Sequence, residues 1–564
     1  NNTNTKRYRA ANTNPMAYNP NVIYQIPPAY NKDGTPLTLS TSFSRAKLNG
    51  FETSNTANQG TRDLSSNYRV IKEHRIPRGT LSYAGHHSND VNSFRCTITN
   101  FNNNGTRTCT SKNGAHENFT VTFEVTRTAS RYSAILKLGD SSFPAATTRN
   151  GSTVTAYYTV PQTGPAHYYE FDGTLAEGQC ESRKNNINAG GEACYRARLV
   201  DETAVYDKDG NRLKHPDKSN KRYPEADGDY VYGRSNFAIW YSFYRSRALA
   251  TLSAASIAFD DLTPNVRFAW QSLNTCDLEG DRSGGTRCGD NSLKPYSSKH
   301  KGEFYTWLRG LYFNVGTPLH EAMNRVGEFL SKPKAYYEFP ERNTPGEMYA
   351  CRASYHVLMT DGMWNETYSV PNGKKDHENF NLPEGGQRYE GQRPFYDGTN
   401  NTLADMAMHY WATDLQPSLE NKVPPHIPYR NEDKNKEFWD PRNNPATWQH
   451  MSNFILGLGL TNALSDPNIP WEGGTFSGVG YERLKSGAVD WPKAQRDHQN
   501  NVYDLWHAAI NSRGEFYSVD DPDAMVQAFK DILDRIAERE ATAAKPGLSS
   551  SMSPVDDPLG DGEH

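Results

Sequence analysis

The chain has 564 residues, and because single domains usually hold about 100–200 residues, we expect several folded regions. Its mean hydropathy of -0.83 is polar, but aromatic residues reach 12%, a share that disordered chains do not carry. The 61 basic and 65 acidic residues give a net charge of -4. This leaves no basic excess to neutralise phosphates, so we expect no nucleic-acid partner. No apolar run approaches the roughly 20 residues that span a bilayer, so we expect no transmembrane segment.

The N-terminal part reads as irregular structure up to about residue 50. It contains the stretch NPMAYNPNVIYQIPPAY, whose Pro and Asn-Pro steps argue against a helix. The sequence begins at Asn1 with no signal-peptide pattern ahead of it. We therefore expect that an upstream segment was removed or lies outside this sequence.

Between about residues 67 and 200 the chain changes to short segments in which apolar and polar residues alternate. The clearest are 120–127 (TVTFEVTR), 132–138 (YSAILKL) and 152–160 (STVTAYYTV). This period of two, interrupted by turn sequences such as NG and PQTG, predicts an antiparallel sandwich or barrel. We expect a self-contained β-rich module inserted at about 51–235.

After about residue 235 the pattern predicts alternating helices and strands. Such alternation builds an open, mostly parallel, doubly wound α/β sheet. The predicted helices are 236–260, 304–311, 318–330, 403–415, 502–511 and 522–537, and the predicted strands are 265–273, 355–359, 454–460 and 515–519.

Two stretches interrupt this alternation, at about 365–399 and 420–447. Both are rich in Pro, Gly, Asn and charge, so we predict surface excursions over one rim of the sheet. The tail 541–564 has the composition of a linker. We therefore expect one α/β domain built from 1–50 and 236–540.

Six of the seven cysteines form near neighbours along the chain. The sequence has no CxxC or CxxH pair, so a zinc site is not expected, and three local disulfides in an oxidising compartment fit best. The alternative is a set of free thiols in a cytosolic protein. Cys351 is left over, and its partner could lie upstream of Asn1. The candidate pairs are Cys96 with Cys109, Cys180 with Cys194, and Cys276 with Cys288.

Two loops place oxygen ligands where a doubly wound sheet binds its ligands, beyond the carboxyl ends of the strands. Asp361 directly follows the apolar segment YHVLM and a Thr, and Thr317 precedes a helix predicted to begin at Pro318. Carboxylate and hydroxyl oxygens suit Mg²⁺ or Ca²⁺. The alternatives are structural, because Thr317 followed by Pro is also a helix N-cap and Asp361-Gly362 is also a turn.

Several long motifs resemble the N-terminal region of the PilC/PilY-type family of type IV pilus tip adhesins and biogenesis factors. The most specific are YHVLMTDGMWN and NPATWQHMSNFILGLGL. They occur with NPMAYNPNVIYQ, NFAIWYSFYRSRALATLSAAS, FYTWLRGLYFNVGTPLHEAMNRVGEF, NTLADMAMHYWATDLQPSLENKVPP and AINSRGEFYSVDDPDAMVQAF in the family's order, over most of the chain outside 51–235.

The resemblance implies a von Willebrand A-like scaffold with a metal-ion-dependent adhesion site, which uses an Asp-x-Ser-x-Ser segment, a Thr and an Asp. Thr317 matches the Thr and Asp361 matches the Asp. The Asp-x-Ser-x-Ser segment occurs nowhere in the 564 residues. Either the remaining ligands lie upstream of Asn1 or the site is incomplete, so binding of Mg or Ca by this sequence is in doubt.

The family also implies function and partners. We expect a non-catalytic adhesin at the pilus tip or cell surface, exported through the periplasm. It would dock on minor pilins, attach to a host-cell or abiotic surface, and act in pilus assembly, retraction control and surface sensing. A C-terminal β-propeller is expected in the full-length protein.

Two other classes of function stay open from the sequence. One is a purely structural pilus-assembly subunit without a ligand, and the other is a secreted metal-dependent hydrolase with its metal at Asp361. The sequence has no GxSxG, HExxH or Walker pattern, which disfavours an enzyme.

Overall fold

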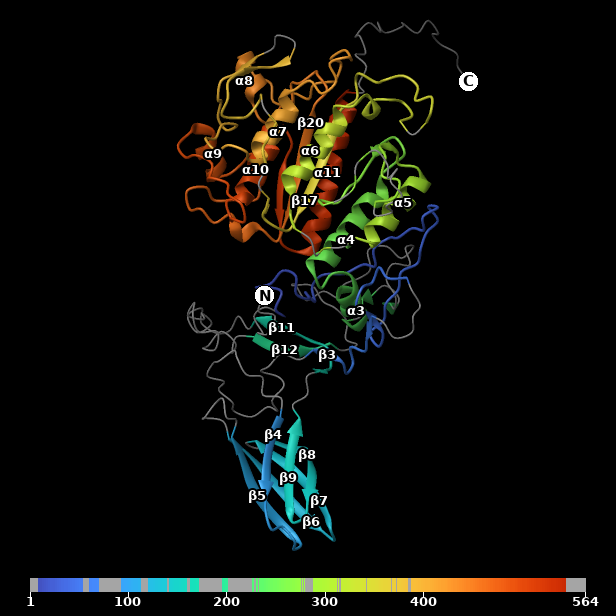
Figure 1. Ribbon diagram of the computed structural model, residues 1–564, viewed down its shortest axis with the longest axis vertical. Coiled ribbons are helices and arrows are strands. Elements are labelled where there is room, and N and C mark those ends of the chain that lie inside the picture. The colour runs from blue at the N-terminus through green and yellow to red at the C-terminus, as the bar shows by residue number, and fades with distance from the viewer. Residues whose placement is uncertain are drawn as a thin grey trace, which may run out of the picture. The chain divides into compact units, whose positions relative to one another are not determined.

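In the computed structural model, the chain forms two compact units (Figure 1). The first comprises Asn1–Ile26 and Leu39–Leu249, and the second comprises Pro27–Thr38 and Ala250–His564. The predicted domain limits at 50 and 235 stay a prediction. The structure describes residues 9–53, 60–69, 93–112, 120–138, 141–159, 163–171, 195–200, 226–227, 230–231, 233–274, 276, 278, 288–311, 313, 316–340, 342–366, 368–371, 373–383 and 387–543.

A six-stranded antiparallel sheet is the main element of the first unit (Figure 1). Its strand order is β4-β9-β8-β7-β6-β5. Along β6, Val121, Phe123 and Val125 are buried at alternate positions, as a strand with one face on a core requires. The strands are β4 (Ser93–Ile98), β5 (Gly105–Lys112), β6 (Thr120–Thr128), β7 (Arg131–Leu138), β8 (Ser141–Asn150) and β9 (Thr153–Thr159).

The two edge strands of this sheet, β4 and β5, are joined to each other without a regular ladder. The predicted disulfide between Cys96 and Cys109 is confirmed and links them, and the Arg95 amide donates to Ser111 Oγ at 3.3 Å. The sheet is therefore a nearly closed barrel, whose free edges are shielded from pairing with other chains.

The other described elements of the first unit are four strand pairs and a helix. Asn236 in the helix accepts a hydrogen bond from the Tyr24 amide at 2.9 Å and donates to the Val22 carbonyl at 2.8 Å. This amide fixes the irregular N-terminal stretch against the helix. The elements are β1 (Ala46–Lys47) with β2 (Thr61–Arg62), β3 (Tyr68–Arg69) with β10 (Thr163–Gly164), β11 (His167–Phe171) with β12 (Tyr195–Leu199), β13 (Ala226–Asp227) with β14 (Tyr230–Val231), and α3 (Gly233–Phe243).

The second unit is built on a three-stranded parallel sheet in the order β17-β20-β21. All eight residues of β20 are buried, as expected for the central strand of a covered parallel sheet. Helices α7 and α10 pack on β20 and on each other, α6 packs on β17, and α11 packs on β20 and β21. The bounds are β17 (Ser354–Thr360), β20 (Met451–Leu458), β21 (Phe516–Val519), α6 (Leu319–Leu330), α7 (Leu403–Ala412), α10 (Asn501–Asn511) and α11 (Pro522–Ala543).

The predicted α/β class is thus confirmed at the level of a mixed fold with a parallel sheet and an antiparallel barrel-like sheet. The single helix predicted at 236–260 is wrong, because the chain turns between α3 and α4 (Arg247–Ala258). Arg245 donates to the carbonyl of Tyr241, and Ser246 Oγ accepts from the Leu249 amide at 3.3 Å and caps the second helix.

Two further predicted elements have different limits. Of the strand predicted at 265–273, only β15 (Arg267–Phe268) is a strand, paired with β16 (Lys294–Pro295). The helix predicted at 304–311 begins earlier, as α5 (Ser298–Arg309), because Ser297 caps it by accepting from the His300 amide at 3.3 Å. The second predicted disulfide, Cys276 with Cys288, is confirmed, whereas Cys180 and Cys194 lie outside the described residues.

The segments predicted as surface excursions also supply side chains to the core. Tyr389 and Phe395 in the first and Trp439 in the second are buried in the main apolar cluster of the second unit. The buried Arg513 guanidinium donates to three backbone carbonyls of the second segment, including that of Asn443 at 2.9 Å. The short elements in and near these segments are β18 (Phe380–Asn381), β19 (Arg388–Tyr389), α8 (Lys434–Trp439) and α9 (Val479–Ser486).

Among the described helices, none has both the length and the apolar character that a membrane crossing requires.

Candidate functional site

Thr317 and Asp361 lie in neighbouring loops at the carboxyl end of β17. The strand ends at Thr360, and the exposed Asp361 follows it directly. A Cβ placed on Gly362 would lie 3.3 Å from Thr317 Oγ1, so this hydroxyl faces the turn beside Asp361. The two residues that the sequence singled out therefore come from different segments to one edge of the sheet.

The structure argues against the simple N-cap interpretation of Thr317. Helix α6 begins at Leu319, so its N-cap residue is Pro318 and not Thr317. The Pro318 side chain forms no capping hydrogen bond. Instead, Glu366 Oε1 accepts from the amide of His320 at 2.6 Å, in the first turn of the helix. Within the described part of the chain, the Thr317 hydroxyl makes no hydrogen bond, so it is available to another partner.

The segment that follows Asp361 positions the Thr317 loop. Asn365 Oδ1 accepts from the Thr317 amide at 2.9 Å, and the Asn365 amide donates to the Thr317 carbonyl at 3.4 Å. Trp364 is buried and donates through Nε1 to Asp504 Oδ2 at 3.1 Å. The sequence motif contains both residues, but it did not reveal that Asn365 joins this segment to the Thr317 loop or that Trp364 anchors it to α10.

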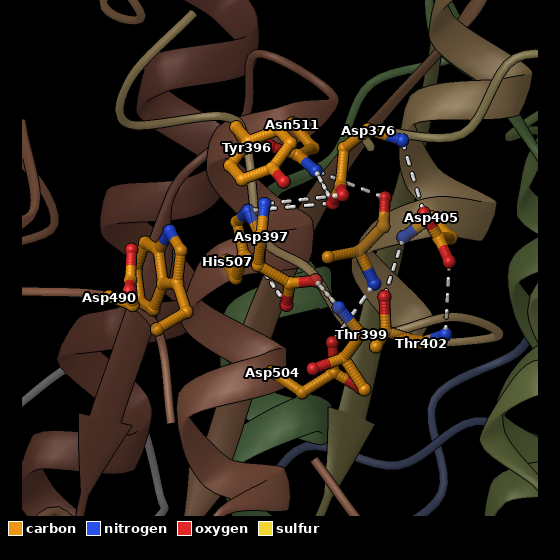
Figure 2. Close-up of polar contacts among 12 residues, drawn as sticks. Asp376, Tyr396, Asp397, Thr399, Thr402, Asp405, Asp490, Asp504, His507 and Asn511 are labelled. Carbon is orange, nitrogen blue, oxygen red and sulfur yellow. Dashed lines mark hydrogen bonds and ion pairs between the residues drawn. The ribbon is translucent and has the colours of Figure 1, made fainter. Parts of the chain in front are cut away.

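A second group of polar side chains is buried deeper in the same unit (Figure 2). Asp376 and Asp397 come from the first predicted excursion, Asp405 from the first turn of α7, and His507 from α10. Two overlapping sets of ligand atoms, one of Asp376, Asp397 and His507 and one of Asp376, His377 and Asp405, each lie within 4.8 Å of one another. We call these five residues the acidic cluster.

Hydrogen bonds fix each carboxylate of the acidic cluster. Asp376 Oδ2 accepts from Asn511 Nδ2 at 2.9 Å, and its Oδ1 accepts from the Asp397 amide at 3.3 Å. Asp405 forms a capping box with Thr402 at the start of α7 and also accepts from the Asp376 amide at 3.1 Å. Among the described residues, backbone and amide donors rather than arginine or lysine therefore preorganise the cluster.

The electrostatics of the acidic cluster are unfavourable for three bare carboxylates. Burial, and then the charges of Asp405 and Asp397, hold the pKa of Asp376 well above its usual range. Burial raises the pKa of Asp405 to about 6. His507 Nε2 donates to the Phe395 carbonyl at 2.7 Å, and its Nδ1 lies 3.5 Å from Asp397 Oδ2. A proton or a cation is needed to compensate the negative charge.

The acidic cluster could hold a metal ion. Its donors are carboxylate oxygens and imidazole nitrogens, a mixture that suits Mn²⁺ or Zn²⁺ better than the oxygen-only set that Ca²⁺ and Mg²⁺ prefer. The three carboxylates are at most 4% exposed, so a substrate has no direct access to them. This cluster was not predicted from the sequence, because its members are spread from 376 to 507 and lie partly in a segment that reads as a surface loop.

Three curated proteins of Pseudomonas aeruginosa are similar to this chain, each named type IV pilus biogenesis factor PilY1. The protein of strain PAO1 is 44% identical over 399 residues, which is 69% of this chain and 30% of that protein. The protein of strain PAK is 49% identical over 330 residues, or 57% of this chain and 28% of that protein. The protein of strain UCBPP-PA14 is 46% identical over 329 residues, which is 58% of this chain and 27% of that protein.

The chain thus spans less than a third of the length of these relatives. No family model matches the sequence. No solved structure matches it either.

Proposed function

Because this chain is a homologue of the type IV pilus biogenesis factor PilY1, we propose that it is a non-catalytic adhesin that acts at the pilus tip and primes pilus assembly. The identity of 44–49% over more than half of the chain carries this proposal. Two confirmed disulfides support a place outside the cytoplasm, as expected for a protein at the pilus tip or cell surface.

For the second unit we propose a von Willebrand A-like scaffold whose ligand site lies at Thr317 and Asp361. The Thr317 hydroxyl, which faces the Asp361 turn and has no hydrogen-bond partner in the part of the chain that the structure describes, supports this assignment. A hard cation takes hydroxyl and carboxylate oxygens from rigid loops. Thr317 and Asp361 would hold Mg²⁺ or Ca²⁺ together with ligands from outside this sequence. An acidic group of the surface receptor would complete the coordination.

Titration calorimetry of the full-length protein with Mg²⁺ and Ca²⁺ tests this site. We expect binding that is lost in Asp361→Ala. A matched control is Asp490→Ala, which removes an exposed carboxylate far along the sequence that pairs with Arg393. Full retention of binding in Asp361→Ala would contradict the assignment.

We also propose that the inserted module of about 51–235 determines which host-cell or abiotic surface is recognised. Its barrel offers strand ends and loops on a rigid scaffold, the usual location of binding residues. The rest of the chain, with a C-terminal β-propeller in the full-length protein, would dock on minor pilins. Because this proposal assigns the two roles to different segments, surface attachment can be tested separately from pilus assembly.

Deletion of about 51–235 distinguishes adhesion from a purely structural role in assembly. The adhesin proposal expects cells that keep their pili but lose surface attachment. Loss of pili together with attachment would instead favour a structural pilus subunit. Twitching motility, measured on the same cells, reports whether retraction is still controlled.

The hydrolase alternative gains no support from the acidic cluster. A hydrolytic metal needs an open coordination position that a substrate can reach. Asp376 and Asp405 are fully buried, and Asp397 is nearly so. We therefore propose that any metal bound there stabilises the fold.

A further inference from the structure

A small cavity lies at the amino ends of β17 and β20, at the opposite end of these strands from Asp361. Ser354, the first residue of β17, and His450, just before β20, form part of its wall. His426, Asn444 and Arg539 also line it. Among the described residues that line the cavity, none is an aspartate or a glutamate.

Arg539, near the end of α11, places a buried positive charge in this cavity. The residue is 8% exposed, and its buried Nη1 has no hydrogen-bond partner among the described residues. Its guanidinium lies 5.0 Å from the ring centroid of Phe454, a contact that offsets only part of the loss of hydration. A guanidinium stays charged in proteins, so it requires a compensating anion when it is buried.

The carboxylates near Arg539 are already held by another arginine on the same helix. Arg535 Nε lies 3.6 Å from Glu515 Oε1, and Arg535 Nη1 lies 3.1 Å from Glu538 Oε2. Within the described part of the chain, no carboxylate lies within ion-pair distance of Arg539. Among the described residues, this charge therefore has no counterion in direct contact.

The two histidines of the cavity add hydrogen-bonding groups but no charge. His450 donates from Nδ1 to the Trp448 carbonyl at 2.7 Å, and its Nε2 accepts from Asn444 Nδ2 at 2.8 Å. This imidazole is therefore neutral, and both of its ring nitrogens already form hydrogen bonds. His426 Nδ1 is also buried, and no described residue forms a hydrogen bond with it. Burial, and then the positive charge of Arg539, lower the pKa of His426 to about 4.

We propose that this cavity is an anion-binding site in which Arg539 Nη1 and His426 Nδ1 donate to one small anion. The cavity has room for about two water molecules, a size that suits a halide ion or a single carboxylate group. Neither the pilus function nor the proposed metal site requires this anion. Its proposed role is to neutralise the end of α11 against the sheet.

Bromide tests the halide form of this proposal, because it replaces chloride in anion-binding sites and its position is revealed by anomalous scattering. We expect crystals of this chain soaked in sodium bromide to show an anomalous peak in contact with Arg539 Nη1. Well-ordered Arg539 and His426 with no peak beside them would overturn the proposal. This measurement uses the unmodified protein, so it does not depend on how a variant folds.

Thermal unfolding at constant ionic strength provides the second test. When sodium chloride replaces sodium gluconate, whose anion is too large for the cavity, we expect the midpoint to rise in the unmodified chain. Arg539→Met should weaken the affinity for chloride, derived from this response, about tenfold or more, because it removes a charged hydrogen bond. The control Arg535→Met, on the exposed face of the same helix, should keep it.

Sodium formate in place of chloride identifies the source of the anion. Stabilisation by formate alone, absent in Arg539→Met, would assign the site to a carboxylate, such as an acidic side chain of a partner. Stabilisation by chloride would assign it to an inorganic ion. The same salt response in the unmodified chain, Arg539→Met and Arg535→Met would overturn the proposal.

Discussion

Replacement of Asp397 by Asn tests whether the acidic cluster binds a proton or a cation. Asn keeps the acceptor for the Thr399 amide, which donates to Asp397 Oδ1 at 2.6 Å. Its new amide group faces His507 Nδ1, which lies 3.5 Å from Asp397 Oδ2. The substitution therefore removes one negative charge with little change in shape.

The size of the effect follows from the distances in the cluster. Ligand atoms of Asp397 and Asp376 lie within 4.8 Å. At an effective dielectric constant of about 20, two unit charges at that separation repel by about 3 kcal/mol. Asp376 escapes part of this cost by binding a proton, so we expect Asp397→Asn to stabilise the metal-free protein by about 1–3 kcal/mol near pH 8.

The pH dependence has a defined sign. A carboxyl with a raised folded-state pKa contributes stability below its unfolded pKa, and this contribution is lost as pH rises through the folded pKa. For Asp405 this window runs from 3.8 to about 6, and for Asp376 it extends higher. The metal-free chain should therefore lose stability over this range. Asp397→Asn should reduce the loss, because the charge of Asp397 raises both pKa values.

The assay is urea unfolding monitored by tryptophan fluorescence. It is run first with EDTA and then with Mn²⁺ or Zn²⁺. Every tryptophan except Trp240 lies beyond residue 249, so the signal reports the second unit. If the cluster holds a metal, the ion should stabilise the unmodified chain and not Asp397→Asn. Asp490→Asn, whose carboxylate is 76% exposed, is the control and should change stability by less than about 1 kcal/mol. Destabilisation of Asp397→Asn in EDTA near pH 8 would refute the electrostatic argument.

Three further tests use substitutions to probe the fold. Glu366→Ala removes the acceptor at the start of α6 and should cost about 1 kcal/mol in urea unfolding; no change would mean that this cap is not formed in solution. Replacing Cys96 and Cys109 by Ser removes a disulfide that joins positions separated by 13 in the sequence, and it should cost the barrel about 2–4 kcal/mol by calorimetry, a loss that reductant should reproduce in the unmodified chain. Gly514→Ala places a Cβ 1.7 Å from a backbone carbonyl of β20 and should prevent normal folding, whereas Gly398→Ala, with open space around it, should be tolerated; equal expression and melting of the two would contradict this packing.

The sequence by itself determined the elements whose signal is local. Alternation over 120–127 predicted β6, and the 3.6-residue period over 522–537 predicted α11, because burial of one face imposes these periods within a short segment. The approach of Thr317 to Asp361 was also foreseeable. Segments that follow or flank the strands of a wound sheet meet at one edge of it.

Only the tertiary structure decided which buried polar groups meet. Asp376 and His507 are 131 positions apart, and Arg539 and His426 come from a helix and a loop that share no local pattern. Their meeting depends on how α7, α10 and α11 pack on the central strand, which hydrophobic periodicity does not specify. The sequence therefore determined which faces are buried, and the packing of those faces decided where unpaired charge is enclosed.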